Sequence, residues 1–305
     1  MMTQKILVTG ATGKQGGAVV KALLANPPPF DYEILAVTRR TTSKAAKALA
    51  SAPHVTLVEG DLNDCTNIFA KAGGVGAVWG VFCVTLPNLK SKVEEQEAKQ
   101  GIDVVDAAIA NKVKHFVYTS VDRGGADKSE VDATYVAHFV SKCKVEKHLQ
   151  EKVRGTDMTY TILRPTAFMD NLNPSLPGRI FAATWHTLGD KRLQLVAVRD
   201  IGVFAAKAFG AADTEDYKNT AISLAGCDLT QAEADEIFWK VLGRPMPRSY
   251  DFVSDFLLYM VPEAGTMVRW FKEQGYGANL EQCRRLNEKM LDFEAYLREE
   301  SGFKR

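Results

Sequence analysis

The sequence predicts an α/β fold in which helices cover both faces of a doubly wound parallel sheet. Over the first 165 residues, short apolar runs alternate with segments whose apolar residues recur at helical spacing, the pattern of successive βαβ units. The apolar runs are continuous, as expected for strands that are buried on both faces. A glycine-rich loop joins the first run to the first helical segment. These observations predict one sheet domain in the first half of the chain.

Six strands and five helices are expected in this part of the chain. The first helix stops at Asn26-Pro27-Pro28-Pro29, because proline has no N–H with which to continue the helical hydrogen bonds. The predicted strands cover residues 6–9, 34–37, 55–58, 77–84, 115–119 and 159–163, and the predicted helices cover residues 14–25, 43–51, 64–72, 91–111 and 134–152.

The regular alternation weakens after Arg164-Pro165. Residues 166–192 are expected to be rich in loops, and residues 250–305 are expected to be mostly helical and rich in aromatic side chains. Thr230 and Glu233 have the spacing of a capping box, which predicts the start of a helix. The remaining expected elements are a strand over 193–198 and helices over 200–211 and 230–242.

Two domains follow from this pattern. The sheet domain covers residues 1–165, and residues 193–225 return to it. A smaller, mostly helical domain is built from residues 166–192 and 226–305, and we expect it to bind a substrate or a partner.

The composition narrows the class of partner. The 305 residues are 46% hydrophobic, and 38 Lys and Arg face 37 Asp and Glu, which gives a net charge of +1. A surface that binds duplex nucleic acid usually shows a basic excess, so we expect no direct nucleic-acid ligand. We also expect no membrane segment and no metal site, because no long apolar run, paired cysteines or HExxH motif occurs. The five cysteines are scattered, which is typical of reduced thiols and favours a location in the cytoplasm or the nucleus.

The strongest motif is the GxxGxxG loop formed by Gly10, Gly13 and Gly16. It follows a predicted strand and opens a predicted helix, together with Thr12, Lys14 and Gln15. Gly10 allows a tight turn, Gly13 lets a diphosphate approach the backbone, and Gly16 lets the helix pack closely on the sheet. The helix N-terminus then offers N–H groups and a partial positive charge to the phosphates. The alternative is a purely structural glycine turn. With the strand and helix around it, the motif predicts a Rossmann-type domain that binds a dinucleotide.

The end of the second predicted strand favours NADP(H) over NAD(H). An NAD site usually has Asp or Glu at this position, but this strand ends Thr38-Arg39-Arg40. The guanidinium of Arg39 matches the 2′-phosphate of NADP(H), which a carboxylate would repel. The alternative is that Arg39 and Arg40 are solvated loop residues.

Further candidate contacts lie where predicted strands end, since ligands of open α/β sheets bind at the carboxyl ends of the strands. Asp61 and Leu62 are expected beside the adenine, although Asp61 or its neighbour Asn63 could equally cap the next helix. Thr85 and Pro165 follow other strands, and Phe168 is expected to wall the nicotinamide or, equally, to belong to the core.

With these motifs identified, the chain resembles the NmrA-like family, whose members are atypical members of the short-chain dehydrogenase/reductase superfamily. The resemblance implies a Rossmann-type NADP domain and a small C-terminal domain. It also implies either a co-regulator that binds the dinucleotide without turnover, as a redox sensor, or a reductase similar to isoflavone reductase. The matching blocks are VTGATGKQGG at 8–17, Thr38-Arg39, EAKQG at 97–101, HFVSK at 138–142, LRPTAFMDN at 163–171 and RDIG at 199–202.

The catalytic pair that the resemblance implies is altered. Active superfamily members use Tyr-x-x-x-Lys, with the tyrosine as proton donor or acceptor and the lysine one helical turn later. Here Lys142 is present, but His138 occupies the tyrosine position and Tyr135 lies seven residues before Lys142. His138 either replaces the tyrosine or is structural, and the cation of Lys142 would disfavour the protonated ring and make it a poor proton donor. Lys142 is expected to contact the cofactor, the alternative being a solvated helix lysine. The thiol of Cys143, next to it, is expected to be buried and inert.

Two functions remain in view. The first is an NADP(H)-binding regulator that senses the redox state through the cofactor and engages a protein partner. The alternative is an NADPH-dependent reductase of a small apolar or aromatic molecule, with Lys142 and His138 as the candidate catalytic residues. A purely structural module is the third reading, and micromolar dinucleotide binding would exclude it.

Overall fold

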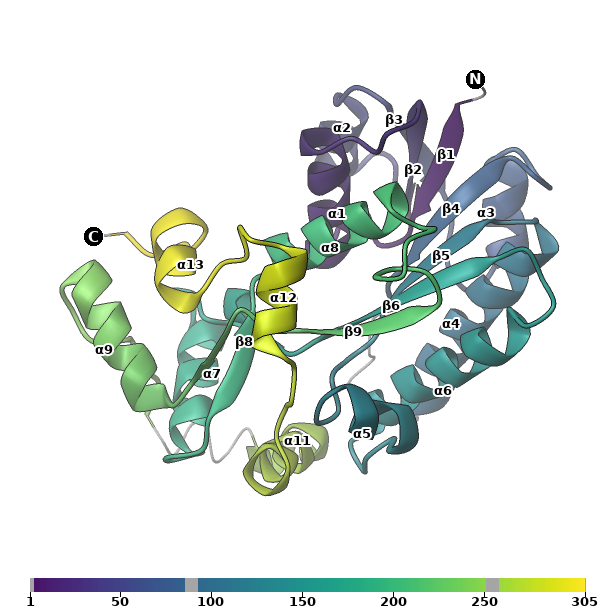
Figure 1. The fold of residues 1–305 in the computed structure, drawn as a ribbon. Coiled ribbons are helices and arrows are strands. Elements are labelled where there is room, and N and C mark those ends of the chain that lie inside the picture. Colours follow the sequence, from purple (N-terminus) through teal and green to yellow (C-terminus); the bar gives the residue numbers. More distant parts are fainter. Residues whose placement is uncertain (1–2, 86–92, 251–257, 305) are drawn as a thin grey trace. The chain divides into compact units, whose positions relative to one another are not determined.

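The fold is described from a computed structural model, in which residues 3–85, 93–250 and 258–304 are described. The chain divides into two compact units, each of which is described by itself (Figure 1). The first unit comprises Met1–Ser120, Val140–Arg164 and Ile201–Ile222, and the second comprises Val121–Phe139, Pro165–Asp200 and Ser223–Arg305.

The first unit is built on a seven-stranded sheet with the strand order β3-β2-β1-β4-β5-β6-β9. The pairs from β3 through β6 are parallel, so the predicted doubly wound α/β fold is confirmed. The order reverses at β1, which pairs with both β2 and β4. The strands are β1 (Gln4–Val8), β2 (Tyr32–Thr38), β3 (Val55–Glu59), β4 (Val78–Cys83), β5 (His115–Thr119), β6 (Thr159–Pro165) and β9 (Thr220–Leu224).

Helices cover both faces of this sheet. Figure 1 shows α3, α4 and α6 along one face and α1 and α8 on the other. Close approach depends on glycine in two places: an added Cβ on Gly101 would lie 2.5 Å from Val145, and one on Gly202 would lie 2.4 Å from the carbonyl oxygen of Ala18. The helices are α1 (Lys14–Ala25), α2 (Lys44–Ala50), α3 (Cys65–Lys71), α4 (Val93–Ala110), α6 (Ala137–Lys152) and α8 (Val198–Gly210).

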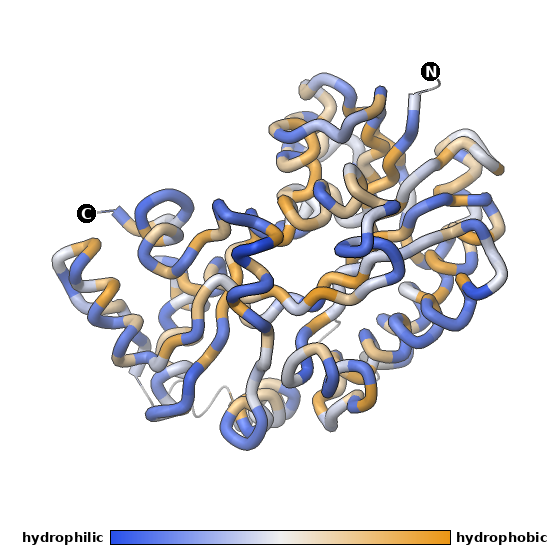
Figure 2. The backbone as a smooth tube through the Cα atoms, viewed as in Figure 1, coloured by the Kyte–Doolittle hydropathy of each residue, from blue (hydrophilic) through white to orange (hydrophobic). Residues whose placement is uncertain are grey.

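Burial explains why the strand predictions succeeded. Residues 115–119 of β5 are all buried, and so are residues 34–38 of β2, which are the continuous apolar runs of the sequence. In Figure 2 the strands of the sheet are largely hydrophobic in colour, whereas hydrophobic and hydrophilic colours alternate along the helices. The expected helix over 91–111 is α4, except that residues 91 and 92 lie outside the described residues.

The second unit combines a small sheet with short helices. Its strands are β7 (Ala167–Phe168), β8 (Leu193–Val196) and β10 (Cys227–Leu229), in the order β10-β8-β7. Its core centres on aromatic side chains, among them Phe139, which meets Trp270 edge-to-face at 5.0 Å. The helices are α5 (Ala126–Val131), η1 (Met169–Asn171), α7 (Leu176–His186), α9 (Gln231–Leu242), α11 (Pro262–Glu273), α12 (Leu280–Leu286) and α13 (Phe293–Glu299).

The expectation that residues 166–192 are loop-rich was wrong, because they contain β7, η1 and α7. Pro177 lies in the first turn of α7, where its missing N–H costs nothing. Gly178 is needed for packing, since a Cβ there would lie 2.1 Å from the carbonyl oxygen of Asn173. The proline and glycine that suggested a loop therefore mark the start of a helix. Three short elements, α5, β9 and β10, were also missed.

The capping box at the start of α9 is confirmed. The Thr230 hydroxyl accepts a hydrogen bond from the Glu233 N–H at 3.2 Å, and the Glu233 carboxylate accepts one from the Thr230 N–H at 2.8 Å. Within the described ranges, no helix is both long and apolar enough to cross a bilayer. The same ranges contain no group of three or more potential metal ligands.

Candidate functional site

The glycine loop turns sharply between β1 and α1. Gly10 has a φ of 58°, in the left-handed region that glycine adopts without strain. The N–H of Gly13 donates to the carbonyl oxygen of Gly10 at 2.8 Å and closes the turn. A Cβ on Gly16 would lie 2.3 Å from that same oxygen, so only glycine fits where α1 crosses the loop. Two of the three glycines thus have the backbone roles expected from the sequence.

The N-terminus of α1 lacks a capping side chain. Gly13 is its N-cap, no side chain accepts from its first turn, and no acidic residue lies in that turn. Thr12, Gly13 and Lys14 are exposed. The partial positive charge of this 12-residue helix therefore faces solvent without a protein counter-charge in its first turn. An anion could bind to these N–H groups.

Hydrogen bonds to the residue after β4 and to the end of β5 hold the loop and its flanks. The Thr9 hydroxyl accepts from the Val84 N–H at 2.8 Å, and the Thr119 hydroxyl donates to the Gln15 amide oxygen at 2.6 Å. Gln15 in the first turn of α1 is thereby tied to the end of β5, and Thr9 at the end of β1 is tied to the residue after β4.

The end of β2 presents Arg39 and Arg40 as exposed residues. The carboxylate of Glu59, which ends β3, lies next to this strand end. Glu59 pairs in register with Thr38, the residue before Arg39. Its Oε2 accepts from the N–H of Thr41 at 3.2 Å and from its hydroxyl at 2.7 Å. These hydrogen bonds from Thr41 lower the pKa of Glu59, which is therefore a carboxylate already engaged with protein.

Asp61 forms a local turn, and the helix cap is a third residue. Asp61 accepts from the backbone N–H of Asn63 at 2.9 Å and from its side-chain amide at 2.6 Å. The N-cap of α3 is Asp64, which accepts from the N–H of Asn67 at 3.1 Å. Capping by Asp61 or Asn63 was therefore the wrong alternative. Asp61 and Leu62 remain at the end of β3, where the adenine contact was predicted.

The most elaborate polar group of the first unit surrounds Lys142. Its ammonium lies 3.1 Å from Glu97 Oε1 and donates to the Thr85 hydroxyl at 3.2 Å. Thr85 in turn donates to Glu97 Oε1 at 2.9 Å, and Ser141 donates to Oε2 at 2.6 Å. Lys142 is 7% exposed and Glu97 2%, so this is a buried ion pair with its oxygens satisfied.

Two opposing effects set the charge of this pair. Burial raises the pKa of Glu97, but the Lys142 ammonium and the hydrogen bonds from Ser141, Lys142 and Thr85 outweigh burial and bring the pKa below its ordinary value. Glu97 is therefore ionised at neutral pH and opposite the ammonium. The alternative of a solvated helix lysine does not describe Lys142, which is buried and points to the end of β4. In the sequence Glu97 was only part of a family block, and its role was missed.

The neighbours of Lys142 are otherwise apolar or inert. The ammonium lies 5.7 Å from the ring centre of Tyr118, within the range of a cation–π contact. Burial raises the pKa of Tyr118 well above its ordinary value, so the phenol stays neutral. Cys143 is 2% exposed, in agreement with the expectation of a buried thiol.

His138 belongs to the second unit, where it binds Glu263. The Glu263 carboxylate lies 2.6 Å from His138 Nδ1 and accepts from the His138 backbone N–H at 3.1 Å. The hydrogen bond from the ring is the largest of the effects that lower the pKa of Glu263. This carboxylate is 125 residues away in the sequence, so the local pattern around His138 does not reveal it. The ring also packs edge-to-face on Phe139 at 4.6 Å.

The last two candidates, Pro165 and Phe168, also lie in the second unit. Pro165 is buried and Phe168 is half-buried in β7. Between them, Thr166 is held by its N–H and hydroxyl, which both donate to the carbonyl oxygen of Leu224, at 3.1 and 3.0 Å. The first unit thus gathers the loop, Arg39, Thr85 and Lys142 at the carboxyl edge of one sheet, whereas His138, Pro165 and Phe168 are described only within the second unit.

The fold and these residues define the class of protein, a Rossmann-type α/β protein with an open phosphate loop. More particularly, the chain belongs to the NmrA-like family, whose model matches residues 2–297. An NmrA-like family domain-containing protein of Dictyostelium discoideum is 23% identical over 97% of this chain and 98% of its own length.

Two solved structures share the fold. The triphenylmethane reductase of Citrobacter sp., crystallised with NADP(H), is 21% identical and has a TM-score of 0.72, over 96% of this chain and 99% of its own. NmrA, a negative transcriptional regulator crystallised with NAD, is 16% identical with a TM-score of 0.71, over 98% of this chain and 96% of its own. A reductase and a regulator are thus equally similar to this chain in fold.

Proposed function

We propose that this protein binds NADP(H) in its first unit and acts as a dinucleotide-dependent regulator with little or no turnover. The observation that carries the binding proposal is the loop before α1, where Gly10 takes a left-handed conformation and the helix starts without a capping side chain. A diphosphate supplies the negative charge that this helix start lacks. The NADP(H)-bound reductase and the NAD-bound regulator of the same fold support the proposal.

The residues of the first unit fit the cofactor from the 2′-phosphate to the nicotinamide ribose. The backbone at Thr12, Gly13 and Lys14 would bind the diphosphate, and Gln15 and Gly16 would hold the helix behind it. Arg39 would bind the 2′-phosphate, while Glu59, held by Thr41, leaves that guanidinium available. Asp61 and Leu62 would flank the adenine, and Thr85 and Lys142 the ribose. When bound, the cofactor would supply or accept a hydride.

The regulator role rests on the surroundings of His138. Both its ring Nδ1 and its backbone N–H engage one carboxylate of α11, which is the arrangement of a structural histidine. The tyrosine that usually donates a proton is absent at this position, so bound cofactor would lack its ordinary partner for turnover. The altered pair therefore supports a protein that binds the cofactor without turning it over.

A second candidate function is an NADPH-dependent reductase of a small apolar or aromatic molecule. The observation that favours it is the buried Lys142–Glu97 pair, which holds an ammonium in one place. A lysine fixed in this way can orient a ribose and stabilise negative charge without a tyrosine. The similar fold of the Citrobacter reductase is consistent with this role.

Titration and turnover separate the two functions. The purified full chain is titrated calorimetrically with NADPH, NADP⁺, NADH and NAD⁺, and loss of the NADPH absorbance band is then followed with quinones, enones and triphenylmethane dyes. The regulator role predicts micromolar binding of the phosphorylated forms and no substrate-dependent oxidation. Turnover that the double variant Glu97→Gln/Lys142→Met abolishes, with neither charge left alone, would replace it with the reductase role. Failure to bind any of the four dinucleotides would contradict both.

A further inference from the structure

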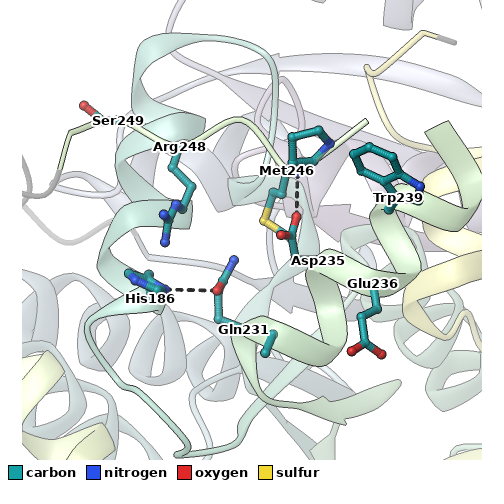
Figure 3. A pocket seen from close by; sticks show the side chains of 10 residues that line it. His186, Gln231, Asp235, Glu236, Trp239, Met246, Arg248 and Ser249 are labelled. Carbon is teal, nitrogen blue, oxygen red and sulfur yellow. Dashed lines mark hydrogen bonds between the residues drawn. The ribbon is translucent and has the colours of Figure 1, made fainter. Parts of the chain in front are cut away.

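A cavity of about 720 Å³ lies wholly within the second unit. It opens between α7, α9 and the segment of residues 245–249 that follows α9 (Figure 3). Its volume falls within the range of small-molecule sites. None of the residues assigned above to the dinucleotide lines it.

The walls of the cavity are held in place by backbone hydrogen bonds. The N–H of Met246 donates to Asp235 on α9 at 2.6 Å, and the N–H of Ser249 donates to the carbonyl oxygen of Arg179 on α7 at 3.0 Å. The segment 245–249 is thereby fixed to both helices. The capping box at Thr230 fixes the first turn of α9, where Gln231 begins the lining.

Gln231 is a lining residue of low exposure, and among the described residues its amide nitrogen has no acceptor. The residue is 6% exposed, and its Oε1 accepts from His186 Nδ1 at 3.1 Å. Its Nε2 donates to no other described residue. Figure 3 shows this nitrogen turned into the open cavity, where it is free to donate to a ligand. The site therefore presents a donor that a ligand oxygen would satisfy.

Arg248 supplies a positive charge at the same place. Its side chain extends toward Gln231 and His186 (Figure 3). In the part of the chain that the structure describes, its guanidinium takes part in no ion pair or hydrogen bond. The planar guanidinium can bind both oxygens of a carboxylate. The guanidinium of Arg248 and the Gln231 amide nitrogen are thus two convergent donors without an acceptor among the described residues.

The rest of the lining limits the kind of anion. Asp235 and Glu236 also line the cavity, and their negative charge disfavours a doubly charged ligand. Met246 and the indole of Trp239, which is 57% exposed, offer an apolar and aromatic surface. We propose that this cavity binds a small organic carboxylate with an aromatic or apolar body, its carboxylate on Arg248 and Gln231 and its body against Met246 and Trp239.

Calorimetry with three probes tests the proposal on the full chain without added dinucleotide. The probes are 2-naphthoate, the uncharged 2-naphthamide and inorganic phosphate. We expect 2-naphthoate to bind at least about ten times more tightly than 2-naphthamide, and phosphate to compete only at much higher concentration, since only the first combines one negative charge with an aromatic body. Equal binding of naphthoate and naphthamide, stronger competition by phosphate, or absence of naphthoate binding would each overturn the proposal.

Variants locate the binding in this cavity. Arg248→Gln and Gln231→Glu are expected to weaken naphthoate binding about 10- to 100-fold, because the first removes a charge-assisted contact and the second places a carboxylate against the ligand. Arg244→Gln, an exposed arginine outside the lining, is the matched control and should bind as the wild type does. Arg248 is exposed, so its replacement does not threaten folding. Unchanged naphthoate binding by Arg248→Gln would overturn the proposal.

Discussion

At the scale of single residues, the Lys142–Glu97 pair shows what a contact between distant residues adds to a motif. The sequence identified Lys142 from its spacing to His138, but its actual partners come from α4 and from the end of β4. A buried ion pair contributes little net stability, whereas removing one partner leaves an uncompensated charge. The main effect of the pair is therefore to fix the position of the Lys142 ammonium, and its net contribution to the stability of the fold is small.

Replacing Glu97 by Gln should destabilise the first unit. The Lys142 ammonium would stay buried without its counter-charge, at a cost of about 3–5 kcal/mol in the free energy of unfolding. Urea denaturation measures this cost. The double variant Glu97→Gln/Lys142→Met should recover most of it, because neither charge is then left alone. If the double variant is no more stable than Glu97→Gln, the ion pair is not the reason for the loss.

Arg39 is expected to decide between the two dinucleotides. Arg39→Ala removes one charge-assisted contact to the 2′-phosphate, which is worth about 1.5–3 kcal/mol, so NADPH binding should weaken about 10- to 150-fold. Binding of NADH should change little, because NADH has no 2′-phosphate. Arg40→Ala is the matched control, since Arg40 is equally exposed and follows directly. Calorimetric titration that finds equal NADPH affinity in Arg39→Ala and wild type would refute the assignment.

At the scale of elements, the start of α1 is fixed by backbone geometry that the sequence reveals directly. Gly→Ala in a helix is usually stabilising by up to about 1 kcal/mol, because alanine has the higher helix propensity. At Gly16 the new Cβ would lie 2.3 Å from the carbonyl oxygen of Gly10, a backbone atom that cannot rotate away. Helix α1 can therefore start at this place only with glycine at position 16.

Gly16→Ala and Gly17→Ala form a matched pair on one helix. At Gly17 the new Cβ would lie 3.3 Å from the carbonyl oxygen of Ala11, which a small adjustment can relieve. We expect Gly16→Ala to lower the free energy of unfolding by roughly 1–3 kcal/mol, as overpacked sites do, and to lose NADPH binding, whereas Gly17→Ala should change stability by less than about 1 kcal/mol. Thermal unfolding with and without NADPH measures both. Equal effects of the two substitutions would contradict the close packing at Gly16.

The elements that were predicted well are those whose pattern is local. The predicted bounds of α1 and β5 match the structure, because both are set by local sequence. The prolines after residue 26 end α1, and a continuous apolar run defines β5. By contrast, α7 was missed because Pro177 and Gly178 suit both a loop and a helix start, and only the contact with Asn173 decides between them. Short strands such as β10 depend on pairing with β8 and have no pattern of their own.

At the scale of the whole molecule, the chain passes between the two units several times. Residues 121–139 leave the first unit, and Val140 returns to it in the first turn of α6. Such a passage leaves no signal in the sequence, because a helix that joins two units has the same periodicity as one that stays in a single unit. The same reasoning applies to the site. The loop and Arg39 are local and could be predicted, whereas the partners Glu97, Glu263 and Glu59 come from other elements.

Asp200 links the start of α8 to the C-terminal part of the second unit. Its carboxylate accepts from the N–H of Leu291 at 2.9 Å and from the Asn287 side chain at 3.4 Å. The residue is 1% exposed, and burial raises its pKa to about 6 even though these hydrogen bonds and Arg199 lower it. The folded protein therefore binds a proton more tightly at this carboxyl than the unfolded chain does.

The sign of the pH dependence follows from this raised pKa. The contribution of Asp200 to stability is fully present below the unfolded pKa of 3.8 and is lost as pH rises through about 6, where the buried carboxylate ionises. Asp200→Asn should therefore stabilise the second unit at pH 7.5, by roughly 2–3 kcal/mol since one pKa unit corresponds to about 1.4 kcal/mol, and the gain should shrink toward pH 4. The new amide can still accept from Leu291, and Asn287 can rotate its own oxygen toward it.

Urea unfolding followed by tryptophan fluorescence at several pH values measures the effect of Asp200→Asn, because three of the four tryptophans, Trp185, Trp239 and Trp270, lie in the second unit. Asp190→Asn removes an exposed carboxylate from the same unit and should leave the pH dependence unchanged. A difference between wild type and Asp200→Asn that stays constant from pH 4 to pH 7.5 would mean that the carboxyl does not titrate in this window. The hydrogen bonds from Leu291 and Asn287 would then outweigh burial, and Asp200 would hold the two segments together as a permanent carboxylate.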